Sequence, residues 1–140
     1  MTRLVRPAHA VTSDFLIGLH HCDPLGVAWH GRYFEWLEMA RMALFASIDL
    51  DVPQIRQLGH RMYVVDAQCR YMAPLAYGDT ARITAWFVAV QPLIKVAYDI
   101  HNPATDRWSA RATTVLATTA ADGTLLATTP EALLARLPVR

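Results

Sequence analysis

The chain has 140 residues, of which 54% are hydrophobic and 18% are charged, and its formal net charge is +1. This length is enough for one substantial core and too short for two ordinary domains, which predicts a single domain over residues 1–140. The small net charge argues against nucleic-acid binding. The low charged fraction predicts additional buried area at a subunit interface.

The cysteine content and the beginning of the chain indicate the compartment. Cys22 and Cys69 have neither metal-site spacing nor the density of a secreted disulfide-rich protein, so reduced thiols are the simpler interpretation. Residues 1–10 contain no apolar run long enough for a signal peptide or a membrane span. We therefore expect a cytoplasmic protein with no membrane span.

The first third of the chain predicts a strand, a loop and one long helix. Residues 10–19 are apolar and β-prone, and the turn formers of residues 20–31 predict a loop after that strand. From about His30 to Leu50, charged side chains recur at every third position among apolar ones, which predicts a helix. A helix that is apolar over most of its surface is normally buried, so we expect a sheet wrapped around it.

The remainder of the chain predicts about four further strands. After a connection over 53–60 with room for one helical turn, strand candidates cover 62–71, a stretch from residue 80, 93–101 and 108–119. Proline- and glycine-containing breaks separate them, which predicts an antiparallel meander.

The end of the chain predicts a short helix over 131–137. Thr129 supplies a capping hydroxyl, and Pro130 suits the first helical turn. The complete pattern is α+β, with the long helix lying along one face of an antiparallel sheet.

The segment around the predicted helix start carries an ordered set of residues. It comprises an aspartate, a glycine, a histidine, an Arg-Tyr pair, an aromatic-Leu-Glu run and an arginine: Asp23, Gly26, His30, Arg32-Tyr33, Trp36-Leu37-Glu38 and Arg41. Residues 71–79, with Pro74 and Gly78-Asp79, add a weaker match. Together they resemble the 4-hydroxybenzoyl-CoA thioesterase family of hotdog proteins, which includes acyl-CoA thioesterases associated with the Tol-Pal system. The resemblance spans nearly the whole chain.

The resemblance implies both a fold and an activity. It implies a hotdog fold, in which a five- or six-stranded antiparallel sheet wraps around the long helix. It also implies a homodimer with joined sheets, or a homotetramer. The implied enzyme is a thioesterase acting on an acyl or aroyl thioester of coenzyme A or acyl carrier protein. No cofactor is implied, because coenzyme A or phosphopantetheine belongs to the substrate.

Asp23 is the residue expected to carry the chemistry. Its carboxylate either attacks the thioester or activates a water, and the sequence leaves both routes open. The resemblance places the oxyanion donor at the backbone N–H of His30, with the N–H of Gly31 next in the same turn. Such groups have no partner within their helix, and the helix dipole favours negative charge there. Gly26 is expected to let the loop pass close to the ligand.

The expected substrate contacts come from several parts of the chain. An acyl pocket is expected to be lined by apolar side chains, namely Val27, Trp29, Met62 and Val64. Lys95 is the expected phosphate contact, with Arg61, Arg82 and Arg111 as further candidates, although solvated strand charges explain these four equally well. Gln91-Pro92 stands where benzoyl-type relatives have arginines, which adds weight to an acyl-carrier substrate.

Other interpretations of the same residues stay open. An isolated Asp-Pro before a helix is usually a turn or a cap. His20 and His21 are alternative candidates for a general base. Cys22 is better explained as a structural residue. Glu38 and Arg41 are more typical of a helix-face pair. No metal is predicted, because adjacent histidines on an extended chain point to opposite faces. The alternative functions are a hotdog hydratase or dehydratase, and a non-catalytic thioester-binding protein.

Overall fold

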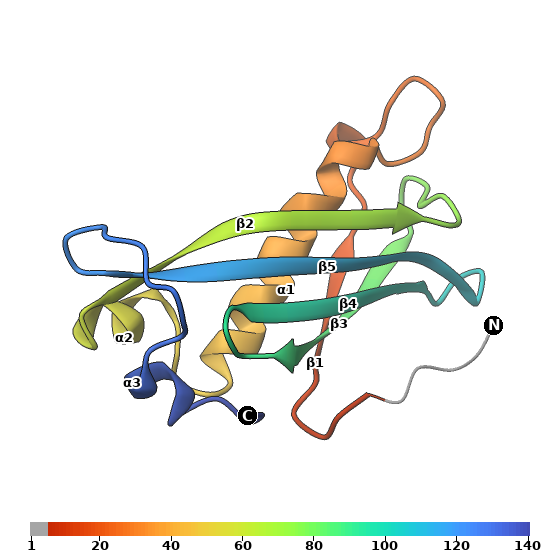
Figure 1. The fold of residues 1–140 in the computed structure, drawn as a ribbon. Helices are drawn as coiled ribbons and strands as arrows, with labels where there is room; N and C mark the ends of the chain where they lie inside the picture. Colours follow the sequence, from red (N-terminus) through yellow and green to blue (C-terminus); the bar gives the residue numbers. More distant parts are fainter. Residues whose placement is uncertain (1–5) are drawn as a thin grey trace.

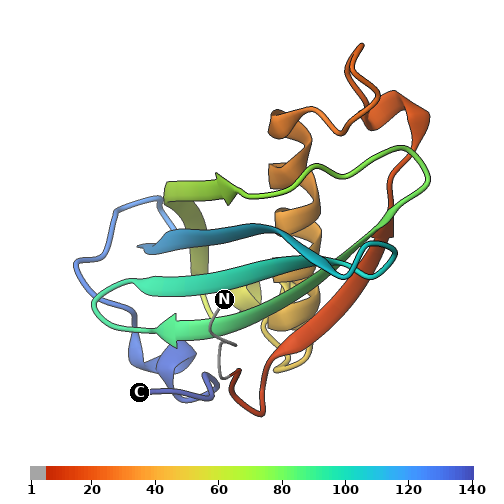
Figure 2. The same ribbon diagram turned by 90° about the vertical axis from the view of Figure 1, so that its right-hand side faces the viewer.

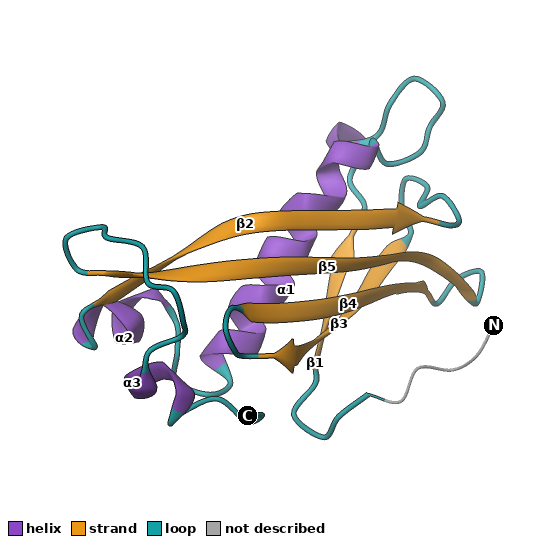
Figure 3. Cartoon of the chain, viewed as in Figure 1, coloured by secondary structure: helices purple, strands orange, loops and turns teal. Residues whose placement is uncertain are grey.

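Residues 6–140, the part of the chain that the computed structural model describes, form a five-stranded antiparallel sheet packed against one long helix (Figures 1 and 3). The strands are β1 (Val11–Leu16), β2 (His60–Tyr71), β3 (Thr80–Ala89), β4 (Ile94–Asn102) and β5 (Arg107–Ala120). The helices are α1 (Tyr33–Ala46), α2 (Val52–Gln57) and α3 (Glu131–Leu134), with 3-10 turns at Leu19–His21 and His30–Arg32. The predicted α+β class is confirmed.

The sheet order is β1-β3-β4-β5-β2. Strands β3, β4 and β5 form the predicted meander, but β2 does not pair with β3, which follows it in the chain. It lies at the far edge beside β5, with Cys69 opposite Ala112. Figure 2 shows α1 lying across one face of this sheet.

One face of α1 supplies much of the core. Trp36, Leu37, Ala40 and Leu44 are at most 1% exposed, and their spacing of three to four residues places them on one side of the helix. They belong to the same core cluster as Ile83 of β3 and other inward-facing strand residues. The opposite side of α1 exposes three large apolar residues, Phe34, Met39 and Met42. The sheet of one chain therefore packs against one side of α1 and leaves Phe34, Met39 and Met42 exposed.

The terminal helix begins differently from the prediction. Pro130 is the N-cap of α3, and the helix ends at Leu134. The Thr129 hydroxyl donates to the carbonyl of Pro92 at 3.2 Å, and the Thr129 N–H donates to the same oxygen at 2.9 Å. The predicted Thr129 cap is therefore wrong, because this side chain ties the C-terminal segment to the turn between β3 and β4.

Two predictions concern the compartment. Across residues 6–140, no helix has both the length and the apolar character needed to cross a membrane. The prediction about a signal peptide also involves residues 1–5, which lie outside the described residues. The cytoplasmic location stays a prediction.

Candidate active site

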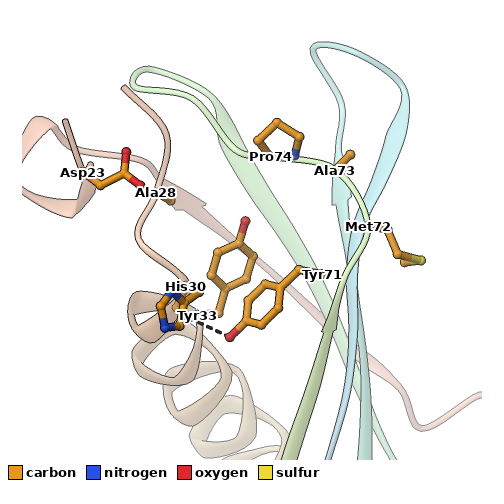
Figure 4. A pocket seen from close by; sticks show the side chains of 8 residues that line it. All are labelled: Asp23, Ala28, His30, Tyr33, Tyr71, Met72, Ala73 and Pro74. Carbon is orange, nitrogen blue, oxygen red and sulfur yellow. Dashed lines mark hydrogen bonds between the residues drawn. The ribbon is translucent and has the colours of Figure 1, made fainter. Parts of the chain in front are cut away.

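An open pocket of about 310 Å³ lies at the N-terminal end of α1 (Figure 4). Eight residues line it: Asp23, Ala28, His30, Tyr33, Tyr71, Met72, Ala73 and Pro74. The Ala28 N–H donates to the Leu75 carbonyl at 2.7 Å, and Val27 forms an isolated bridge with Ala76. These contacts hold the loop before the helix against the segment after β2. The pocket thus combines the two segments that carry the family resemblance.

Asp23 begins a tight loop that its own atoms stabilise. The Asp23 N–H donates to the Val27 carbonyl at 2.9 Å, and the Gly26 N–H donates to the Asp23 carbonyl at 3.0 Å. The carboxylate oxygen Oδ1 accepts the Leu25 N–H at 2.9 Å, and this turn does not use the second oxygen. The half-buried carboxylate is therefore fixed at the pocket wall with one oxygen left for other contacts.

Gly26 is explained by its backbone conformation. Its φ is +80°, in the left-handed region that side chains other than glycine rarely adopt. No atom lies within 4 Å of the position that a Cβ would take. The expected close approach of this glycine to a ligand stays a prediction.

The start of the helical region supplies two backbone donors. The 3-10 turn His30–Arg32 continues directly into α1, and its first hydrogen bond is donated by the Arg32 N–H to the Trp29 carbonyl at 2.9 Å. The N–H groups of His30 and Gly31 precede this bond, so the helix offers them no acceptor. They lie at the positive end of the helix dipole, where a developing negative charge is stabilised.

Two aromatic side chains surround this turn. The Tyr71 hydroxyl donates to the His30 carbonyl at 2.7 Å, which is the dashed contact in Figure 4. The Trp29 ring packs over Gly31 so closely that a Cβ on this glycine would collide with the ring. Both contacts restrict the backbone that carries the two donors.

The two tyrosines of the pocket are neutral hydrogen-bonding groups. Burial, followed by the charge of the Cys69 thiolate, raises the pKa of Tyr33 to about 12 and that of Tyr71 to about 12. Their rings meet edge to face, with centroids 4.8 Å apart. Both hydroxyls keep their protons at neutral pH, so they act as donors and not as bases.

His21 supports the fold of the loop. Its Nδ1 accepts the Gly18 N–H at 2.8 Å, and its ring meets Trp36 edge-on at 5.0 Å. Burial, followed by the charges of His20 and Arg32, lowers the pKa of His21. The neutral ring that results can accept this hydrogen bond, which accounts for His21 without a catalytic role.

The cysteines and acidic groups show no metal cluster in the described part of the chain. Cys22 and Cys69 are free and half-buried, and burial raises the pKa of the Cys69 thiol, which disfavours a reactive thiolate. Within residues 6–140, no group of three or more His, Cys, Asp or Glu side chains is placed to hold a metal ion. The absence of a metal or cofactor in the working protein stays a prediction.

Some predicted substrate contacts lie away from Asp23. Met62 lines a groove between β2, α1 and α2, and Val64 is 45% exposed on β2. Lys95 is exposed on β4 and alternates with the core residue Val96, so it projects from the sheet face opposite α1. None of the three lines the pocket of Asp23 in a single chain, and their roles stay predictions.

The three arginine candidates for phosphate binding are also outside this pocket. Arg82 makes two hydrogen bonds to Asp14, at 3.0 and 3.1 Å. Arg111 stands opposite Asp99 in the pairing of β4 with β5, and Arg61 lines the groove beside α2. The sequence analysis missed Tyr71 and Met72 as pocket residues, although both belong to the weaker of the two matched segments.

The sequence profile of the thioesterase-like superfamily matches residues 17–137, and the chain belongs to this superfamily. The predicted relationship to the 4-hydroxybenzoyl-CoA thioesterases is thereby confirmed at the level of the family.

Individual relatives carry related names. A candidate esterase of Synechocystis is 39% identical over 83 residues, which cover 59% of this chain and 48% of that protein. The candidate acyl-CoA thioesterase YneP of Bacillus subtilis is 29% identical over 97 residues, covering 69% of this chain and 70% of YneP. The chain thus spans about half the length of the Synechocystis relative that it matches.

Solved structures confirm the hotdog fold. A 4-hydroxybenzoyl-CoA thioesterase, determined as an Asp-to-Asn variant with 4-hydroxybenzoyl-CoA, has a TM-score of 0.80 at 20% identity, covering 91% of this chain and 98% of its own. The 1,4-dihydroxy-2-naphthoyl-CoA thioesterase of Synechocystis has a TM-score of 0.79 at 18% identity, with coverages of 91% and 95%. At these identities, the likeness establishes the fold alone.

Gly31→Ala is expected to shift the two backbone donors, because the added methyl group displaces the Trp29 ring. The kcat/KM for the thioester hydrolysis proposed below should then fall about tenfold. Kinetics of thiol release measure this effect. In a Trp29→Ala background the methyl group has room, so Gly31→Ala should cause little further loss there. Equal losses in both backgrounds would show that the Trp29 contact is not the cause.

Proposed function

We propose that this chain is a thioesterase that hydrolyses an acyl or aroyl thioester of coenzyme A or of acyl carrier protein in the pocket of Asp23. The observation that carries the proposal is the meeting of the Asp23 carboxylate and the helix start in one pocket. Thioester hydrolysis needs a nucleophile or base and donors for the carbonyl oxygen as it gains charge. The pocket offers both.

The proposed reaction begins with attack on the thioester carbonyl carbon while its oxygen accepts hydrogen bonds from the N–H groups of His30 and Gly31. By one route, Asp23 removes a proton from water as the water oxygen attacks. By the other, the carboxylate itself attacks, and water then hydrolyses the resulting anhydride. Both routes break the carbon–sulfur bond and release a carboxylic acid and a thiol. The neutral tyrosines line the pocket and transfer no proton in either route.

Coenzyme A thioesters are the favoured substrate class. The name of YneP refers to acyl-CoA thioesters, and the names of the two structurally similar enzymes described above refer to aroyl-CoA thioesters. Tyr33 and Tyr71 line the pocket and suit a planar acyl group. Lys95, Arg61, Arg82 and Arg111 do not line this pocket, so an acyl-carrier thioester stays in the proposal as the second substrate form.

A substrate panel tests the proposed function. Purified protein is assayed with aroyl-CoA, fatty acyl-CoA and acyl-carrier thioesters, and a thiol reagent detects the products. Thiol release from part of the panel supports the proposal. Loss of enoyl absorbance without thiol release would instead indicate a hydratase, and binding without turnover would indicate a thioester-binding protein.

We also propose that two chains pair through β2 as a homodimer. β2 lies at the sheet edge, and Tyr63, Val64 and Val65 are 51%, 45% and 53% exposed. A long apolar edge strand is a template for pairing with another chain. In an antiparallel pair centred between Tyr63 and Val64, Arg61 of one chain would face Asp66 of the other, so the charges are complementary.

Val65→Glu is expected to convert the proposed dimer into monomers, because it places two carboxylates near the two-fold axis of the interface. Sedimentation or light scattering measures the mass. Val88→Glu is the matched control, because Val88 is 51% exposed on β3, away from β2. A wild-type monomer would contradict the proposed dimer, and a Val65→Glu dimer would contradict the proposed interface.

A further inference from the structure

The peptide group between His30 and Gly31 has two donors on its carbonyl oxygen. The Tyr33 N–H donates to the His30 oxygen within the helical turn, and the Tyr71 hydroxyl donates to the same atom at 2.7 Å. A carbonyl oxygen has two lone pairs, so these bonds use its accepting capacity. The first bond belongs to the helix, whereas the second comes from a residue 41 positions later, at the end of β2.

The geometry of a peptide group links this oxygen to the proposed oxyanion donor. A trans peptide is planar, and its C=O and N–H bonds point in opposite directions. Fixing the His30 carbonyl therefore fixes the direction of the Gly31 N–H. A hydrogen bond to the carbonyl also polarises the amide, which makes its N–H a stronger donor. Donors held in place before the reaction stabilise developing charge most effectively.

We propose that Tyr71 is a positioning residue for thioester hydrolysis, whose hydroxyl orients and polarises the His30–Gly31 peptide so that the Gly31 N–H faces the substrate oxyanion. This inference rests on the proposed function. Tyr71 acts through the backbone and takes no proton from the substrate.

Two further observations distinguish this role from packing alone. The Tyr71 side chain is 42% exposed, so burial of its ring contributes less than for the core aromatic Trp36, which is 1% exposed. Its raised pKa keeps the hydroxyl protonated, so the bond to His30 persists through the neutral and mildly basic range. The edge-on contact with Tyr33 at 90° holds the ring while the hydroxyl reaches the helix start.

Tyr71→Phe tests the proposal because it keeps the ring and removes only the hydroxyl. We expect kcat for the most rapidly hydrolysed thioester of the panel to fall about tenfold, with KM unchanged within about twofold, since the donor is misaligned but not removed. Tyr77→Phe is the control, because Tyr77 is 62% exposed in the connection after β2 and does not line the pocket. It should match the wild-type protein.

Infrared spectroscopy measures the strength of the hydrogen bond to the substrate carbonyl through its stretching frequency. The same thioester, labelled with ¹³C at its carbonyl, is bound to Asp23→Asn protein with and without Tyr71→Phe. Loss of the hydroxyl should move the carbonyl stretch toward its value in water, because the Gly31 N–H polarises it less. A purely structural role of Tyr71 would leave this frequency unchanged.

The outcomes separate this inference from the function on which it rests. Absence of thiol release by the wild-type protein overturns both. Hydrolysis by the wild-type protein with an equally active Tyr71→Phe variant overturns the positioning role alone. A rise in KM at constant kcat, or an unchanged carbonyl frequency, also overturns the positioning role alone.

Discussion

Asp23→Asn is expected to lower kcat for thioester hydrolysis about a thousandfold, which lies within the range supplied by general acid–base catalysis. Asparagine has nearly the shape of aspartate, and its amide oxygen can still accept the Leu25 N–H that Oδ1 accepts at 2.9 Å. The loop is therefore kept. The neutral amide can neither remove a proton from water nor attack the thioester efficiently, so both proposed routes lose their central group.

Asp122→Asn is a control matched in local geometry. Asp122 lies in the turn after β5, and its Oδ1 accepts the Thr124 N–H at 2.9 Å, the same contact two residues along that Asp23 makes. This variant removes the charge of an equivalent turn outside the pocket and should leave kcat and KM unchanged. If Asp23→Asn released thiol as fast as Asp122→Asn, Asp23 would have no part in the chemistry.

The elements of the fold were predictable where the pattern is local. The periodicity from His30 onward located the helical region that ends at Ala46, and the alternation from Thr80 located β3. The pairing of β2 with β5 was not predictable, because no local pattern tells a strand which distant strand will be its neighbour. The chain between β2 and β3 crosses from one sheet edge toward the other. Along this path it makes hydrogen bonds to distant residues, from the Met72 N–H to the Ser109 carbonyl and from the Gly78 N–H to the Ile17 carbonyl.

The candidate site likewise combines residues related by a local sequence pattern with a residue that only the fold brings to them. Asp23 and His30 belong to one short motif, so the sequence alone placed them together. Tyr71 completes the site only because the end of β2 meets the start of the helix, a contact that joins residues far apart in the chain. Met62 lies nine positions before Tyr71, so at about 3.3 Å per residue it is roughly 30 Å away along the strand. The apolar character of Met62 and its place in β2 were therefore not sufficient to predict whether it lines the pocket of Asp23.

Strand β2 links the proposed site to the proposed interface. Its end carries Tyr71, and its middle carries the exposed edge around Val65. A second chain paired along that edge would bring its own α2 region near the Tyr71 end of the first. In such a dimer, the groove lined by Met62 could contribute substrate contacts that a single chain lacks. The predicted roles of Met62 and Val64 are therefore to be tested in the dimer.

Arg6→Met is expected to lower the free energy of unfolding by about 3 kcal/mol at neutral pH, because it removes the cation that bonds directly to a buried carboxylate and leaves the more distant charge of Arg111. Nε and Nη2 of Arg6 lie 2.7 and 2.6 Å from Oδ2 of Asp99, whose side chain is 2% exposed. The other carboxylate oxygen, Oδ1, is buried without a hydrogen-bond partner among the described residues. Urea unfolding at several pH values measures the loss.

The pH dependence identifies Asp99 as the cause. Burial raises the pKa of Asp99 although Arg6 opposes the shift, so the folded state binds this proton more tightly than the unfolded state. Stability from this group is greatest at low pH and falls as pH rises through the interval between the ordinary and the raised pKa. Removing Arg6 raises the pKa of Asp99 in the folded state further. The loss of unfolding free energy in Arg6→Met should therefore be small near pH 4 and should grow toward neutrality. Arg82→Met is the control, because Arg82 and Asp14 are 47% and 49% exposed and such a pair contributes at most about 1 kcal/mol. Equal, pH-independent losses in the two variants would contradict the assignment of a buried ion pair to Asp99.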